Sequence, residues 1–180
     1  MHCPACDDAT LAPSELEHGL LSLGCKDCDG HLVSLVSYRL WHDRFRAEAT
    51  TDDNSQESLE SDTRKALLCP KCQRVMLKHK YSATHSRRLD LCTHCDEVWF
   101  DGGEWEHLRR LALTDSLPAV FTEPWQRALR SQESEQSMAQ RWRDVLGDDH
   151  DRAADIARWL ADNPNAAHIL RFLHDQHGGH

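Results

Sequence analysis

The pattern of apolar and polar positions divides the chain into a β-rich first part and a helical last part. Alternating or continuous apolar runs predict strands at 20–24, 31–37, 75–81 and 87–92. Apolar residues three or four apart predict helices in the C-terminal part of the chain. The predicted fold class is therefore small β modules, two in number, followed by an all-α region.

The C-terminal helices are predicted from caps and breaks as well as from periodicity. A short helix from Gly103 ends before Pro118, and a long helix covers 122–147. Two short helices then flank Asn163–Pro164, and their closeness along the chain predicts a helical hairpin. A DNA-reading helix-turn-helix would be basic, yet residues 148–175 hold six aspartates and three arginines. We expect the apolar faces of these helices to form a core or to dock a protein partner.

All eight cysteines stand in four Cys-x-x-Cys pairs. The pairs are Cys3 with Cys6, Cys25 with Cys28, Cys69 with Cys72, and Cys92 with Cys95. Eighteen residues lie between the first two pairs and nineteen between the last two, so one pattern is used twice. This spacing is typical of a tetrahedral zinc site with four thiolates and no open position for substrate. We predict two structural Zn²⁺ ions, one in each repeat.

Other uses of paired cysteines fit the sequence less well. A thioredoxin-like redox pair should occur once, at the start of a helix in a βαβ unit. Disulfides suit secreted chains, whereas "MHCPAC" at the N-terminus is not an apolar signal segment, so we expect a reducing cytoplasm. A cross-braced arrangement, in which ligands alternate between two sites, stays open, although the forty residues between the repeats favour two separate ribbons.

Residues 69–108 contain a longer motif than the cysteine pairs alone. They resemble the bacterial zinc-ribbon family named after transcription factor IIB, in which a second Cys-x-x-Cys is followed by an aromatic, acidic and glycine-containing tail. The matching residues are Cys69, Pro70, Cys72, Cys92, Cys95, Trp99, Asp101, Gly103 and Glu104. Glu97 stands where the family usually has glycine, and Trp105 where it usually has leucine. The resemblance implies a zinc ribbon and does not by itself imply a transcription factor.

The first repeat resembles this family more loosely. It keeps Cys3, Pro4, Cys6, Cys25, Cys28 and Gly30, but it lacks the acidic tail. In the second repeat, Asp101 and Glu104 are spaced as a capping box at the start of a helix. We interpret this pair as a helix cap rather than as two catalytic carboxylates. Aromatic residues Trp99 and Phe100 are expected to cover the metal and the hairpin.

Charge is distributed unevenly along an acidic chain of formal net charge −9. Residues 47–62 hold six acids and no base, and their polar, Ser-rich composition predicts a mobile linker. Residues 63–89 hold eight bases and no acid. The candidate contact residues in this basic hairpin are Arg74, Lys78, Lys80, Arg87 and Arg88. They would bind nucleic acid or an acidic protein, or else be neutralised by neighbouring acids.

Thirteen histidines suggest a further metal site, but most are isolated. The C-terminal tail holds His174, His177 and His180, of which the first two lie one helical turn apart, but a frayed, solvated end is the simpler interpretation. We see no set of nucleophile, base and oxyanion donor, and each thiol has a role at a zinc site. No apolar run is long enough to span a membrane, so no membrane partner is expected.

The predicted domains are zinc ribbon one at 1–46, the acidic linker at 47–62, zinc ribbon two with a short helix at 63–113, and a helical region at 114–180. We expect a non-catalytic, cytoplasmic adaptor or regulatory protein that acts through protein–protein contacts. The first alternative is a nucleic-acid-associated protein of the transcription or translation machinery. The second is a metal-dependent enzyme or chaperone.

Overall fold

The computed structural model describes residues 1–6, 8–45 and 65–177. The chain divides into two units, Met1–Glu133 and Ser134–His180, and the boundary falls inside one long helix. The predicted acidic linker lies outside the described residues. Among these residues, no helix is long and apolar enough to cross a membrane.

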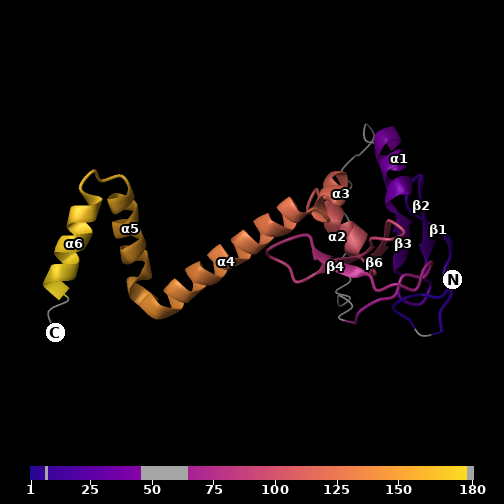
Figure 1. Cartoon of the computed structure of the whole chain (residues 1–180), viewed down its shortest axis with the longest axis horizontal. Coiled ribbons are helices and arrows are strands. Elements are labelled where there is room, and N and C mark those ends of the chain that lie inside the picture. Colours follow the sequence, from indigo (N-terminus) through magenta and orange to yellow (C-terminus); the bar gives the residue numbers. More distant parts are fainter. Residues whose placement is uncertain (7, 46–64, 178–180) are drawn as a thin grey trace. The chain divides into compact units, whose positions relative to one another are not determined.

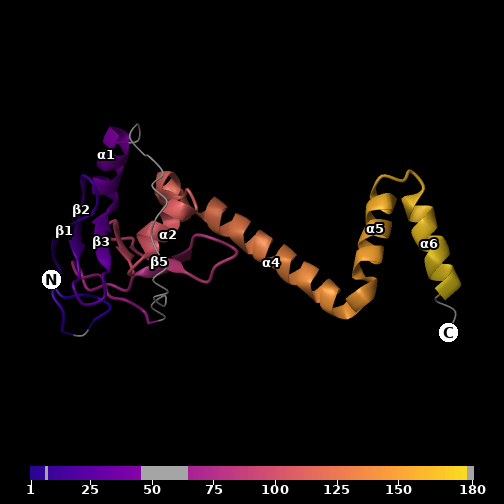
Figure 2. The same ribbon diagram turned by 180° about the vertical axis from the view of Figure 1, so that it is seen from behind.

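The first unit contains one antiparallel sheet of six strands in the order β1-β2-β3-β6-β5-β4 (Figures 1 and 2). The first repeat supplies β1 (Ala12–Glu17), β2 (Leu20–Gly24) and β3 (His31–Ser34). The second repeat supplies β4 (Leu77–Lys80), β5 (Arg88–Cys92) and β6 (Glu97–Phe100). The two predicted ribbons therefore do not stand apart, because their third strands pair and make a single sheet.

The pairing of β3 with β6 relates the two repeats by a local twofold axis. Leu32 lies opposite Trp99, and each stands seven residues after the first cysteine of the second pair in its repeat. The neighbouring partners, His31 with Phe100 and Val33 with Val98, exchange equivalent positions in the same way. Such self-complementary pairing is what a symmetric dimer interface requires. Here both halves belong to one chain.

A short helix follows the third strand of each repeat and packs on the same face of the sheet. These helices are α1 (Leu35–Phe45) and α2 (Glu104–Arg110). Tyr38 of α1 and Trp105 of α2 are both buried, and their rings meet edge to face with centroids 6.5 Å apart. They share a core with buried Val33, Val98 and Phe100 of the sheet. Burial of these side chains supplies the main hydrophobic stabilisation of this face.

Helix α1 corrects the sequence interpretation of residues 31–37 as one strand. The strand ends at Ser34, and the backbone N–H of Leu35 donates to the carbonyl of Asp96 across the join between the repeats at 2.8 Å. Leu35 and Tyr38 then follow helical spacing and are buried in the core. The period changes from two to about 3.6 inside a run in which the pairs Leu32–Val33 and Leu35–Val36 fit both a strand and a helix, which hides the boundary.

The segment after α2 is also helical but is broken into pieces. A 3-10 turn at Thr114–Ser116 leads into α3 (Leu117–Val120), whose first turn contains Pro118. Helix α4 (Glu123–Leu146) follows and confirms the long predicted helix. Near its start, Gln126 donates through Nε2 to the carbonyl of Lys80 at 2.7 Å, which covers part of the β4 edge.

The second unit contains the end of α4, a 3-10 turn at Gly147–Asp149, α5 (His150–Ala161) and α6 (Ala166–His177). The C-terminal region is thus largely helical, as the sequence predicts, and the helix break falls at Asn163–Pro164. None of its described residues is buried, so this unit has no hydrophobic core of its own.

Candidate metal centres

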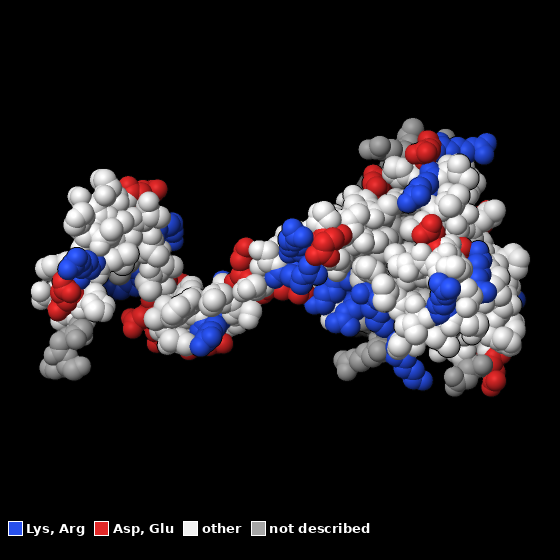
Figure 3. Space-filling view, in the orientation of Figure 1, with Lys and Arg blue, Asp and Glu red and all other residues white. Residues whose placement is uncertain are grey.

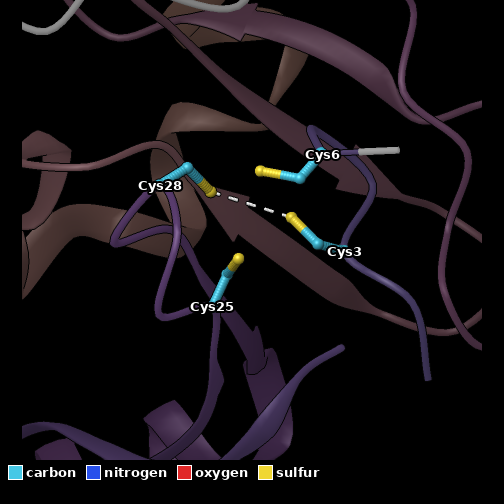
Figure 4. Close-up of side chains that lie close together, drawn as sticks. All are labelled: Cys3, Cys6, Cys25 and Cys28. Carbon is cyan, nitrogen blue, oxygen red and sulfur yellow. Dashed lines mark hydrogen bonds between the residues drawn. The ribbon is translucent and has the colours of Figure 1, made fainter. Parts of the chain in front are cut away.

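Site 1 consists of Cys3, Cys6, Cys25 and Cys28, whose sulfur atoms all lie within 4.8 Å of one another. Figure 4 shows the four side chains pointing toward a common centre. The Sγ atoms of Cys3 and Cys28 are 3.7 Å apart. Two of the four residues are buried and two are half-buried. The site therefore combines ligands from both ends of the β1–β2 hairpin.

Site 2 consists of Cys69, Cys72, Cys92 and Cys95, with the same limit of 4.8 Å between sulfur atoms and the same alternation of buried and half-buried residues. The Sγ atoms of Cys72 and Cys92 are 3.6 Å apart. Each site takes all its ligands from one repeat, so the cross-braced alternative is excluded. The structure brings together both cysteine sets that the sequence predicts.

The sulfur separations fit a tetrahedral metal rather than a disulfide. Four thiolates around Zn²⁺ at about 2.3 Å place their sulfur atoms about 3.8 Å apart. A disulfide would require about 2.05 Å. Separations of 3.6 and 3.7 Å match the metal geometry, and all eight cysteines are free. The thiolate donor set and its spacing suit Zn²⁺, which would be held by four ligands in each site.

The knuckles that carry the ligands have the same backbone turn in both repeats. Asp29 and Asp96 each follow the last cysteine of their site, and both adopt a left-handed conformation with φ of 53° and 54°. Asp tolerates this region better than most side chains. In site 1 the backbone N–H of Cys25 also donates to the carbonyl of Gly30 at 2.8 Å, which closes the turn. The two repeats seen in the sequence therefore share the same backbone turn after their last cysteine.

Without metal, the cysteine thiols of the two sites differ in pKa, and Cys72 and Cys95 differ even within site 2. Burial raises the pKa of Cys3 to about 11. A hydrogen bond from the backbone N–H of Arg74 lowers the pKa of Cys72 to about 7. The shared hydrogen bond with Cys72 raises the pKa of Cys95 to about 12. Metal binding requires every ligand as thiolate, so loading must displace protons from the thiols whose pKa is raised.

Trp99 connects the two sites. It is fully buried and packs in one cluster with Leu32 and with cysteines of both sites, on the sheet face opposite the helices. Its indole lies against Gly30 in the second knuckle of site 1, where an added Cβ would overlap Cζ2 and lie 2.8 Å from Cη2. The sequence predicts Trp99 as a cover for its own ribbon, whereas its ring lies against the knuckle of the other one.

The acidic tail of the second repeat serves the structure of the turn before α2. The Asp101 carboxylate accepts from Trp99 Nε1 at 2.8 Å, and Glu104 Oε2 accepts from the backbone N–H of Asp101 at 2.9 Å. The helix N-cap is Gly103 with φ of 76°, and it makes no side-chain cap hydrogen bond. The Glu104 half of the predicted capping box is formed, and the Asp101 side chain orients the indole.

Glu97 is the site residue whose role the sequence did not reveal. It is almost fully buried at the start of β6, and it accepts a charge-assisted hydrogen bond from Lys71 Nζ in the first knuckle of site 2. This ion pair ties the two knuckles of the site together. An acid at the usual glycine position, together with a lysine between the first two ligands, is the signal that would have indicated it.

The five candidate contact residues of the basic hairpin are not equally available. Lys78 pairs with the buried carboxylate of Asp90 at 2.7 Å, and Lys80 pairs with Glu133 of α4. Arg74 and Arg88 are exposed, and Arg87 is half-buried. Figure 3 shows Lys and Arg side chains gathered over this hairpin and the first turns of α4.

Among the described residues, only the two cysteine sets group three or more metal-binding side chains. His174 is exposed and lies 3.9 Å from Asp175, while His180 lies outside the described part of the chain.

Comparisons with protein-family models, with curated proteins and with solved structures find no match.

Proposed function

We propose that this protein is a non-catalytic, zinc-binding adaptor that acts through protein–protein contacts. In this proposal two structural Zn²⁺ ions fix the sheet of the first unit, and the C-terminal helices dock onto a protein. The observation that carries the proposal is the exposed apolar surface of the second unit, from Met138 to Leu173. Large apolar side chains that stay exposed on several helices indicate an interaction site.

The metal sites support a structural role for the ions. Four thiolates complete the coordination of Zn²⁺ and leave no position at which substrate or water would be activated. The ligands lie in a cluster with Leu32, Met76 and Trp99, as in a core. Removing the metal would leave four thiols crowded in each half of one small domain, so the ions contribute directly to folding.

The family resemblance and the compartment belong to the same proposal. Residues 69–108 carry the motif of the bacterial zinc ribbons named after transcription factor IIB, and both repeats form the hairpin and knuckles such modules use. Eight free cysteines gathered into metal clusters suit a reducing cytoplasm. We propose that the protein is a zinc-ribbon protein of that compartment.

The test is affinity capture from the native cell with quantitative mass spectrometry. Tagged full-length protein is compared with Trp142→Glu/Trp159→Glu, which places charge on the exposed helix faces. Leu40→Glu, at a position in α1 that is 69% exposed, is the matched control. We expect one heterologous protein to be enriched by the wild type and the control and lost with the double variant. Equal capture by all three chains, or enrichment of no other protein, would contradict the proposal.

A second candidate function is nucleic-acid binding by the basic hairpin. The exposed Arg74 and Arg88 and the basic group in Figure 3 favour it. The pairing of Lys78 and Lys80 with carboxylates, and the net charge of −9, oppose it. We expect weaker than micromolar binding of RNA or DNA in fluorescence anisotropy at about 150 mM salt. Submicromolar, salt-sensitive binding that Arg74→Ala/Arg88→Ala abolishes would make this function the leading one.

A further inference from the structure

The described helices of the second unit expose more apolar surface than a monomer of this size is expected to leave in water. Eight large side chains are between 40% and 65% exposed. They are Met138, Trp142 and Val145 of α4, Ile156 and Trp159 of α5, and Leu170, Phe172 and Leu173 of α6. Each helix therefore has an apolar face that the described residues leave uncovered.

The helical spacing shows that seven of these eight positions form faces, and only Phe172 lies off the face that Leu170 and Leu173 make on α6. Met138, Trp142 and Val145 are four and three residues apart, which places them on one side of α4. Ile156 and Trp159 are separated by three residues on α5, as are Leu170 and Leu173 on α6. An amphipathic helix gains most of its stability by burying such a face.

The size of this surface fits one protein partner of similar size. Aromatic side chains each bury on the order of 150–250 Å², and large aliphatic side chains somewhat less. With about half of each side chain exposed, the eight together offer roughly 800 Å². This equals the area that each partner contributes to an interface of standard size. Two copies of the same surface would bury roughly 1,600 Å² in total.

The charges around these faces are of both signs and are compatible with a partner that has the same surface. Residues 134–177 contain eight acids and five arginines, and both signs occur on α4, α5 and α6. Arg158 is already paired with Asp155 at 2.9 Å on the polar side of α5. A strongly acidic or basic partner would find no complementary field here. A second copy offers five arginines to the eight acids of the first, so ion pairs can form across the interface, and each copy keeps three acids in excess.

We propose that the C-terminal helices cover one another in a twofold dimer of this chain. This inference rests on the proposed function, since it names the first protein that the helices bind. An isologous interface places each apolar face against a face of the partner helices. The dimer presents two metal-binding units on one assembly, which would raise the avidity for any further partner with repeated sites.

The test is the mass of the zinc-loaded, full-length protein by light scattering coupled to size exclusion, with dissociation followed by analytical ultracentrifugation. We expect about 41 kDa, twice the 20.6 kDa of one chain. Trp142→Glu/Trp159→Glu should raise the dimer Kd by about 100-fold or more, since buried tryptophans dominate interfaces. Leu40→Glu should leave it unchanged. Zinc content and far-UV circular dichroism verify that each variant has kept the metal-binding unit folded.

Three results would overturn the dimer. They are a wild-type chain that is monomeric at tens of micromolar, an assembly larger than two chains, and a dimer that Leu40→Glu disrupts while the tryptophan variant does not. A monomeric wild type that still captures a heterologous protein through Trp142 and Trp159 would refute the dimer and keep the proposed function. A dimer that captures no other protein would support the dimer and refute the proposed function.

Discussion

Leu32 and Trp99 lie opposite each other in β3 and β6, and they occupy the same position of the two repeats. Both are buried in the cluster that contains the metal ligands. The larger side chain, Trp99, extends over the second knuckle of site 1, where Gly30 leaves room for it. The two residues that face each other across the local twofold axis are therefore different side chains. The two metal sites are joined by this pair into one structural unit.

The first prediction concerns the fit of Trp99 against Gly30. Gly30→Ala adds a methyl group that would overlap the indole, so the ring or the knuckle must move. We expect the free energy of unfolding to fall by about 1–3 kcal/mol, the usual cost of overpacking a core. Chemical denaturation of the zinc-loaded protein measures this change.

A double-mutant cycle controls for effects of Gly30→Ala on the turn itself. Trp99→Leu replaces the indole with the side chain found at the equivalent position, Leu32. If the clash causes the loss, Gly30→Ala should cost much less in the Trp99→Leu background. An equal cost in both backgrounds would show that alanine disturbs the knuckle and not the indole.

The second prediction concerns communication between the sites. Cys92→Ser removes one ligand of site 2, and the motif spacing alone predicts that site 1 then stays loaded. The shared sheet changes this expectation, because β6 of the second repeat pairs with β3 of the first. We expect the wild type to bind two zinc ions, and Cys92→Ser to bind one with reduced affinity.

Elemental analysis and competition with a chelator measure the number of ions and their affinity. Cys25→Ser is the reciprocal variant and should weaken site 2. Unchanged affinity of the remaining site in both variants would mean that the repeats fold independently. Loss of both ions from either variant would instead mean that the two sites fold as one cooperative unit.

Spacing determines which cysteines come together, which is why the sequence predicts both four-cysteine clusters. Four thiolates at short and fixed separations satisfy zinc wherever the rest of the chain lies. The joining of the ribbons is different, because it depends on which strand edges meet. Strands β3 and β6 are short, so few residues determine that these two edges pair. The sequence pattern of an inner strand also resembles that of an edge strand. The role of Glu97 was hidden for a similar reason, since its partner Lys71 is distant in sequence.

The third prediction concerns the order in which metal is lost. The knuckles of site 1 (3–8 and 25–30) contain four aspartates and one lysine, whereas those of site 2 (69–74 and 92–97) contain two acids and two bases. A four-thiolate zinc site carries two net negative charges, so nearby acids destabilise it and nearby bases stabilise it. We expect a chelator to remove zinc from site 1 first.

The Cys25→Ser and Cys92→Ser variants assign the two phases of zinc release to their sites. The double variant Asp27→Asn/Asp29→Asn should release zinc from site 1 more slowly than the wild type does. In the wild type, lowering the salt concentration should make zinc release from site 1 faster. Earlier release from site 2 would show that local charge does not control metal lability here.

The fourth prediction concerns the ion pair between Lys78 and Asp90. Both residues face one another across β4 and β5, and the Asp90 side chain is 1% exposed. Asp90→Ala leaves a buried lysine without this partner, and we expect a loss of about 3–5 kcal/mol in the free energy of unfolding. Replacing both residues, by Lys78→Met with Asp90→Leu, should cost much less.

The pair of Lys80 with Glu133 provides a matched control, because both of these side chains are about 30% exposed. Glu133→Ala should cost about 0–1 kcal/mol. Similar costs for Asp90→Ala and Glu133→Ala would mean that Asp90 is solvated in solution. The comparison also tells whether Lys78 is a structural residue or is free to contact a ligand.

The fifth prediction concerns acid sensitivity at His79. Burial lowers the pKa of this side chain, which packs edge to face on Phe121 at 5.3 Å. Between the ordinary histidine pKa near 6.5 and the lowered one, the unfolded chain binds a proton that the folded chain does not. The contribution of His79 to stability is therefore complete above about pH 6.5 and is lost as the pH falls toward the lowered pKa.

Between pH 7.5 and 5.5, His79→Leu should lose less unfolding free energy than the wild type, and metal loss in acid is common to both. His168→Leu, at an exposed position of α6, controls for removal of a histidine as such. An identical pH dependence in the wild type and in His79→Leu would refute the buried, neutral state of His79.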